Sequence, residues 1–125
     1  MKAIELRMGN IALNSSNEAV TVREISNTLV RTTPDDIHLI SELKPIPLTE
    51  DILLKCGFEK AGYGRYHSLE FKGFRKGLYD VFLLENGSIT FMDNVFEKLI
   101  TSVKHVHQLQ NLYFALCGEE LEVNL

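Results

Sequence analysis

The chain has little cysteine for its 125 residues, with Cys56 and Cys117 as its two examples. They lie far apart and form no C-x-x-C pair, so a paired redox or zinc motif is excluded. Reducing compartments keep thiols free, and we therefore expect a cytoplasmic protein in which both thiols are reduced and pack in the core.

Long apolar runs are also missing. No run approaches the roughly 18 residues that a membrane helix needs. Residues 1–7 lack the apolar core of a signal peptide. We expect no membrane association.

An excess of positive charge is absent as well. There are 13 Lys and Arg against 17 Asp and Glu, a net charge of −4. This balance argues against a protein whose whole surface grips phosphates, although a local basic patch remains open. The hydrophobic content of 45% is that of an ordinary soluble protein. The length suits a single domain, residues 1–125, with its own core.

Short strands separated by turn residues fill the N-terminal part, from about 4 to 43. The expected strands lie near 20–22, 28–32 and 37–43, and the residues Pro34-Asp35-Asp36 favour a turn. An antiparallel sheet fits this pattern. A small SH3-like barrel is one form that such a sheet can take.

A capped helix over about 49–57 follows an extended Pro-rich connector. Thr49 is a suitable N-cap, and Gly57 can end the helix in a left-handed conformation. Leu48 and Leu53 have the spacing of a hydrophobic staple. Sequence signals for the start and the end of the helix therefore agree.

A hairpin over about 78–91 is predicted from Asn86-Gly87, because both residues tolerate positive φ. Between helix and hairpin we expect a strand over 66–71 and a loop over 72–77. After the hairpin we expect a strand over 99–104 and a final edge strand over 119–125. The fold class is α+β: an antiparallel sheet, a short central helix and a C-terminal helix packed on the sheet.

The C-terminal helix, about 105–117, carries an apolar arc and an uncharged polar face. The arc is wide enough to bury and comprises Val106, Leu109, Leu112, Tyr113, Leu116 and Cys117. The other face comprises His107, Gln108, Asn111 and Phe114. No Lys or Glu lies between Val106 and Gly118.

Amides and imidazoles make directed hydrogen bonds, so this face is a candidate binding surface for a protein partner. In that case, substituting His107 and Asn111 together would leave folding intact and abolish binding. The alternative is that these side chains satisfy backbone groups of the same domain.

Residues 59–79 offer a second candidate surface, with five Lys or Arg against two Glu. Cations interleaved with aromatics are typical of single-stranded nucleic-acid binding. The residues concerned are Arg65, Lys72, Arg75, Lys76, Tyr63, Tyr66 and Phe74. The alternative is a solvated loop beside core aromatics.

Metal and catalytic motifs are weak. His105 and His107 diverge on a helix, His38 and His67 are distant, and zinc needs three or four converging ligands. Cys117 lies at a helix C-terminus, where the helix dipole disfavours a thiolate. We expect no metal and no cofactor, and lean away from an enzyme, with a small hydrolase or transferase as a further alternative.

Four blocks resemble an uncharacterised family of small proteins from gut-type anaerobic bacteria, their prophages and phages. The blocks are LRMGN at 6–10, IPLTE at 46–50, LLKCGF at 53–58 and VHQLQNLYFAL at 106–116. Cys117 stands where the family leads us to expect threonine. The resemblance implies a phage or mobile-element setting and carries no activity. We therefore hypothesise a non-enzymatic, cytoplasmic binding protein.

Overall fold

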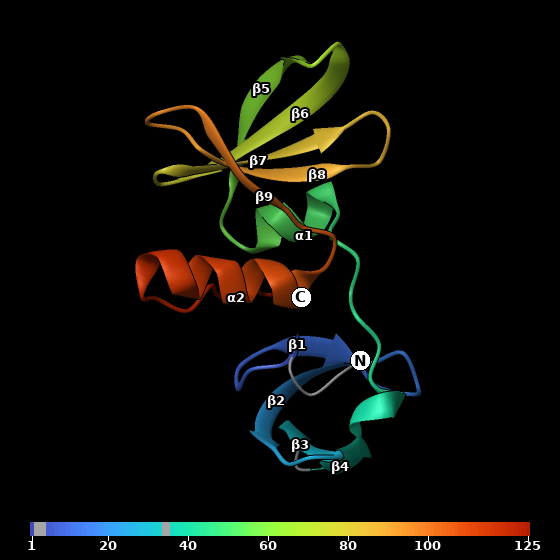
Figure 1. Cartoon of the computed structure of the whole chain (residues 1–125). Helices are drawn as coiled ribbons and strands as arrows, with labels where there is room; N and C mark the ends of the chain where they lie inside the picture. Colours follow the sequence, from blue (N-terminus) through green and yellow to red (C-terminus); the bar gives the residue numbers. More distant parts are fainter. Residues whose placement is uncertain (2–4, 34–35) are drawn as a thin grey trace. The chain divides into compact units, whose positions relative to one another are not determined.

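The computed structural model describes residues 1, 5–33 and 36–125 (Figure 1). It is α+β, with one four-stranded and one five-stranded antiparallel sheet. Residue contacts divide the chain into two compact units where we expected one domain. The N-terminal unit is Met1–Pro47 with His105–Leu121, and the central unit is Leu48–Lys104 with Glu122–Leu125.

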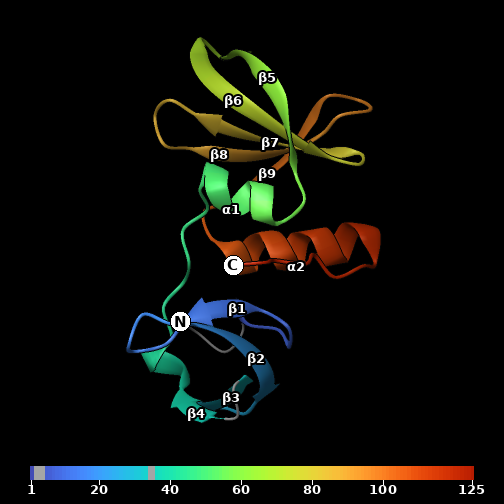
Figure 2. The same ribbon diagram turned by 180° about the vertical axis from the view of Figure 1, so that it is seen from behind.

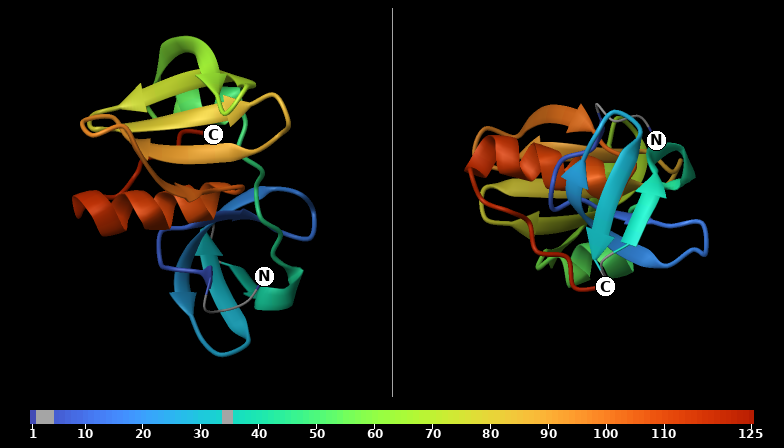
Figure 3. Two further views of the ribbon diagram at one scale, coloured as in Figure 1. Left: turned by 45° about the horizontal axis from the view of Figure 1, so that its top comes forward. Right: turned by 90° about the horizontal axis from the view of Figure 1, so that it is seen from below.

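The sheet of the N-terminal unit is a meander in the order β1-β2-β3-β4. Its strands are β1 (Ile11–Leu13), β2 (Ala19–Ile25), β3 (Leu29–Thr33) and β4 (Asp36–Leu39). The right-hand view of Figure 3 shows these short strands and the 3-10 turn η2 (Ile40–Glu42). The sheet confirms the expected β-rich N-terminal part, while Pro34 and Asp35 of the expected turn lie outside the described residues.

The expected strand over 37–43 is wrong in its second half, which forms η2. The N–H of Leu43 bonds to the carbonyl of Ile40, at 3.1 Å, and this tight turn breaks the extended backbone. A single bridge joins Leu13 to Lys44. Among the described residues β1 and β4 share no ladder, so the SH3-like barrel has no support.

Alternating apolar residues of these strands meet in one core. Val20 and Val22 on β2 point to the same face because side chains alternate along a strand. The buried cluster comprises Leu6, Ala12, Val20, Val22, Val30, Ile40 and Leu43.

The central unit begins with α1 (Glu50–Lys55), which confirms the predicted capped helix. The Thr49 hydroxyl accepts a hydrogen bond from the N–H of Ile52 at 3.3 Å. Gly57 follows the helix with φ +88°. Leu48 and Leu53 are both buried, as the staple requires.

Five strands in the order β5-β6-β7-β8-β9 complete this unit. They are β5 (Glu59–Tyr66), β6 (Leu69–Lys76), β7 (Tyr79–Leu84), β8 (Ile89–Asp93) and β9 (Lys98–Ser102). Strands β7 and β8 confirm the predicted hairpin, and β9 confirms the strand after it. Figure 2 shows the long β5–β6 hairpin projecting away from α1.

The predicted strand over 66–71 is right for Leu69–Phe71, which begin β6, but a turn interrupts it after Tyr66, and the predicted loop over 72–77 is wrong. His67 and Ser68 turn the chain with φ values of +50° and +68°, and most of residues 72–77 belong to β6. A two-residue turn with positive φ normally uses Asn or Gly, so His-Ser gave no turn signal.

The predicted C-terminal helix is confirmed as α2 (Val106–Cys117), which ends at Gly118 with φ +72°. Helix α2 contacts β1 within the N-terminal unit. The predicted edge strand over 119–125 is wrong, because these residues pair with no strand of the described chain, although Leu121 is buried. Among the described residues, no helix is long and apolar enough to span a membrane.

Candidate functional site

The structure splits the predicted polar face of α2. His107 and the neighbouring Gln110 are buried, with 4% and 2% of their surfaces exposed. Asn111 is half-buried, whereas Gln108 and Phe114 are exposed. The face is therefore not one continuous exposed surface.

Gln110 and Asn111 make their hydrogen bonds to the segment 5–11 of the N-terminal unit. Oε1 of Gln110 accepts from the N–H of Ile11 at 2.9 Å, and its Nε2 donates to the Gly9 carbonyl at 3.1 Å. Oδ1 of Asn111 accepts from Nδ2 of Asn10 at 2.8 Å. These amides join α2 to the start of the chain.

Arg7 extends this contact toward solvent. Its Nε donates to Oδ1 of Asn111 at 3.2 Å, and its guanidinium lies 4.4 Å from the ring centroid of Phe114. It also forms an ion pair with Glu120, and the hydrogen bonds from Arg7 lower the pKa of the Glu120 carboxyl. Phe114 therefore has a cation above its ring.

Gln108 and His107 also interact locally. Oε1 of Gln108 accepts from the N–H of His105 at 3.0 Å and caps the helix start. The His107 ring lies parallel to that of His105, with centroids 5.8 Å apart. Burial, followed by the charge of His105, lowers the pKa of His107, which favours the neutral ring.

Cys117 is exposed, so its predicted place in the core is wrong. The end of the apolar arc is uncovered, since Leu116 is 41% exposed. Strand β1 has three residues and spans about 10 Å, whereas the twelve-residue α2 spans about 18 Å. Cys56 is buried as predicted, and burial raises the pKa of its thiol to about 11.

The basic and aromatic segment 59–79 forms the β5–β6 hairpin and reaches the first residue of β7, Tyr79, so it is not a loop. Arg65 lies 3.5 Å from Glu70, and Lys72 lies 3.8 Å from Glu50. Arg75 forms two hydrogen bonds with the Asp80 carboxylate, at 2.8 and 3.1 Å.

The other predicted residues of this segment lie in different surroundings. Phe74 is a core residue with 1% exposure, whereas Tyr63 is 82% exposed. Tyr66 is half-buried, with its ring edge toward Phe82. Nζ of Lys76 lies against Gly57, 2.7 Å from the position that a Cβ would take.

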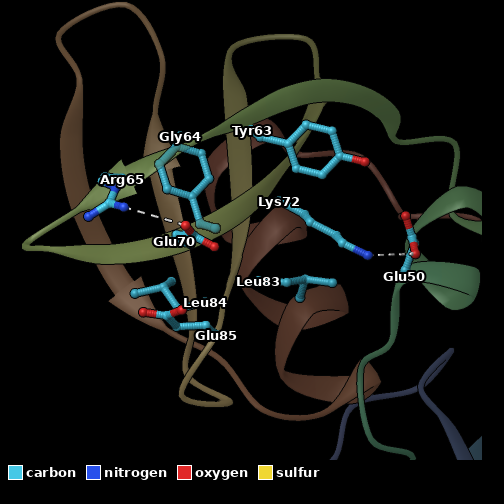
Figure 4. Close-up of a pocket in the computed structure, with 10 residues that line it drawn as sticks. Glu50, Tyr63, Gly64, Arg65, Glu70, Lys72, Leu83, Leu84 and Glu85 are labelled. Carbon is cyan, nitrogen blue, oxygen red and sulfur yellow. Dashed lines mark ion pairs between the residues drawn. The ribbon is translucent and has the colours of Figure 1, made fainter.

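A hollow of the central unit, here called the hairpin groove, lies beside β5, β6 and β7 and measures about 730 Å³. The Lys72–Glu50 and Arg65–Glu70 ion pairs stand at opposite ends of it (Figure 4). Its lining comprises Glu50, Tyr63, Gly64, Arg65, Glu70, Phe71, Lys72, Leu83, Leu84 and Glu85. The groove combines an apolar wall with charged ends.

No metal-binding geometry appears in residues 1, 5–33 and 36–125, where no three His, Cys, Asp or Glu side chains are grouped to hold an ion. Nε2 of His38 lies 3.6 Å from Oδ2 of Asp36.

Sequence patterns did not identify four residues of the candidate sites, which are Arg7, Asn10, Gln110 and Glu50. The partners they contact are distant in sequence.

Comparison with protein families, curated proteins and solved structures finds no match to this chain.

Proposed function

We propose that this chain is a non-enzymatic binding protein that takes a segment of a protein partner into the hairpin groove. The observation that carries this proposal is the groove itself, an open hollow of about 730 Å³ with an apolar wall and charged ends. Pre-formed hollows of this size, with a few placed polar groups, are typical binding sites.

The apolar wall supplies the surface that a partner side chain would bury. Leu83 and Phe71 are half-buried, so part of their surface still faces solvent. Tyr63 stands at the groove with 82% of its surface exposed. Exposed tyrosines are enriched among the residues that dominate binding energies at protein interfaces.

The charged residues of the groove favour a basic segment. Three carboxylates and two cations line it, and within the described chain Glu85 has no ion-pair partner. The lining therefore has a net charge of −1. We infer that the bound segment carries an apolar side chain next to Lys or Arg, since complementary charge favours association.

The polar face of α2 is the weaker candidate for the partner site. Gln110 and Asn111 already have hydrogen-bond partners in the segment 5–11. A partner would have to break these bonds. The groove needs no such exchange.

Nucleic-acid binding remains an alternative. Arg65, Lys72 and Arg75 each have a carboxylate partner. A phosphate would compete with that carboxylate, so the ion pairs lower the binding free energy that we expect from phosphate contacts.

The cytoplasmic location and the phage or mobile-element origin belong to the same proposal. Both cysteines are free thiols, which supports a reducing compartment. The origin rests on the resemblance of the blocks 6–10, 46–50, 53–58 and 106–116.

Selection of a random peptide library on the intact chain tests the proposal. We expect enriched peptides with an apolar residue next to Lys or Arg, and at least about tenfold weaker binding to Tyr63→Ala. Leu83→Glu should weaken binding similarly, and its circular dichroism spectrum checks that the fold is kept. Gln108→Ala, on the exposed side of α2, is the matched control.

Equal affinity of the enriched peptides for the wild type and Tyr63→Ala would contradict the groove as their site. Weaker binding to Gln108→Ala alone would return the site to α2. Failure to enrich any peptide, with single-stranded oligonucleotide binding at low salt instead, would favour the nucleic-acid alternative.

A further inference from the structure

A second hollow beside the same strands, here called the aromatic hollow, measures about 390 Å³. Phe82 lines it, and the adjacent Leu83 lines the hairpin groove. The two hollows share Tyr63, Arg65 and Phe71 in their linings. Of the two, the groove alone is lined by Leu83, and the aromatic hollow alone by Tyr66 and Phe82, so variants at these three positions change the two sites separately. The volume falls within the range of about 300–1,000 Å³ found for small-molecule sites.

Three aromatic rings form the apolar part of this hollow. Phe71 and Phe82 stack with centroids 4.0 Å apart, and Tyr66 meets Phe82 edge-on at 6.3 Å. Gly64 makes room for this arrangement, because a Cβ there would lie 2.7 Å from Cζ of Phe71. The rings are half-buried and still line open space.

A rigid polar pair stands beside the rings. Asp80 is 6% exposed and accepts hydrogen bonds from Nε and Nη2 of Arg75. Nδ2 of Asn94 holds the same carboxylate at 3.3 Å and donates to the Gly77 carbonyl at 2.9 Å. A buried carboxylate with two partners fixes the guanidinium plane.

Arg75 still has hydrogen-bonding capacity toward the hollow. Its side chain is 55% exposed. Within the described chain, Nη1 has no hydrogen-bond partner. It can therefore donate to a ligand without losing Asp80.

The charge of the lining argues against an anionic ligand. Arg65 and Arg75 face three carboxylates, those of Asp80, Asp93 and Glu97. The net charge is −1, while donors and acceptors stand side by side. A phosphate or carboxylate would meet repulsion, whereas a hydroxyl group can both donate and accept.

We propose that the aromatic hollow binds a neutral saccharide ring, whose C–H face lies against an outer face of the stacked Phe71–Phe82 pair beside Tyr66. Vicinal hydroxyl groups of the ring accept from Nη1 of Arg75 and donate to the carboxylates of Asp93 and Glu97. Sugar rings combine an apolar face with such hydroxyl pairs. The proposal does not depend on the hairpin groove.

Titration of the intact, ¹⁵N-labelled chain tests it. The probes are methyl glycosides of glucose, galactose, mannose and N-acetylglucosamine, and cellobiose, at millimolar concentrations. Inorganic phosphate and oligothymidylate are the comparators. We expect at least one saccharide to shift the amides of Tyr66, Phe71 and Phe82, with no comparable shift from phosphate.

Variants separate this site from the groove. Arg75→Gln and Tyr66→Ala should each weaken saccharide binding by at least about tenfold, as for residues that contribute strongly to binding. Leu83→Ala should leave it unchanged. Arg75→Gln removes the partner of the buried Asp80 carboxylate and can therefore disturb folding. If that variant does not fold, the saccharide affinity of Tyr66→Ala decides the test.

Three results would overturn the proposal: no response to any saccharide, unchanged affinity in Tyr66→Ala, or a response to oligothymidylate alone. The last result would assign the hollow to nucleic acid. A saccharide response lost in Leu83→Ala but kept in Tyr66→Ala would place the sugar in the hairpin groove instead.

Discussion

Helix α2 and the β5–β6 hairpin both present polar side chains, but these side chains have different partners. On α2, Gln110 and Asn111 bond to residues about a hundred positions earlier and are wholly or partly buried. On the hairpin, Arg65 and Lys72 pair with carboxylates across exposed surface. The α2 amides join parts of one unit, whereas the hairpin charges border an open hollow.

The difference shows that residue type alone does not distinguish a binding face from a structural one. The uncharged face of α2 suggested recognition, because amides make directed hydrogen bonds. Buried backbone groups need the same directed bonds. The cations and aromatics of the hairpin suggested nucleic-acid binding, with a solvated loop as the alternative. In the structure Arg65 and Lys72 pair with carboxylates that border the hairpin groove.

The largest expected effect on stability is that of Gln110→Ala. It leaves the N–H of Ile11 and the carbonyl of Gly9 without their partners. We expect a loss of roughly 2–4 kcal/mol in the free energy of unfolding, measured by urea denaturation. Gln108→Ala, two residues earlier on the helix, should cost about 1 kcal/mol or less because it removes the hydrogen bond that caps the helix start. Equal losses of unfolding free energy in the two variants would contradict the distinction between the buried Gln110 amide and the exposed Gln108 amide.

Two arginine variants test the same comparison between α2 and the hairpin, with smaller expected losses in the free energy of unfolding. Arg7→Gln removes bonds to Asn111 and Glu120 and should cost about 1–2 kcal/mol. Arg65→Gln removes one exposed ion pair and should cost less than about 0.5 kcal/mol. The same urea titration measures both. A larger loss for Arg65→Gln would mean that the hairpin charges are structural.

Mild acid should produce the smallest effect, in two separate windows. Because the pKa of His107 is lowered, the unfolded chain takes up the proton first, so stability falls as the pH drops below the usual histidine value of 6.5. The lowered pKa of Glu120 stabilises the fold above the usual value of 4.5, and this contribution is lost in stronger acid.

Two variants assign the windows, with unfolding midpoints measured against pH. His107→Gln should flatten the first window and keep the second. Glu120→Gln should do the reverse. An unchanged slope in both variants would show that other groups control the acid response.

Local signals predicted the elements with short-range causes. Thr49 and Gly57 act within a few residues of their positions and work as expected. The hairpin forms where Asn86-Gly87 predicted it, but Gly87 alone of the two takes positive φ, and the Asn86 side chain accepts a hydrogen bond from the N–H of Ser88 instead. The His67-Ser68 turn escaped prediction because neither residue signals positive φ. A turn of this kind is held by the pairing of β5 with β6, which is not visible in the turn residues themselves.

The candidate sites depended on long-range contacts, and here the sequence was least informative. Helical periodicity could not show that Asn10 and Ile11 would meet Gln110. Likewise, spacing grouped Lys72 with other cations, whereas the fold pairs it with Glu50 from α1. Cys117 followed the apolar arc yet stays exposed, because β1 is too short to cover the helix end.

The most direct test of the account is a chemical-shift map of the intact, ¹⁵N-labelled chain with a peptide selected from the library. Binding in the hairpin groove predicts the largest shifts at the amides of Tyr63, Lys72 and Leu83. The amide resonances of Gln108 and Asn111 should not shift, because the hydrogen bonds of these residues lie within the N-terminal unit. Large shifts at Gln108 and Asn111 with none at Tyr63 and Leu83 would contradict the account and make α2 the binding surface.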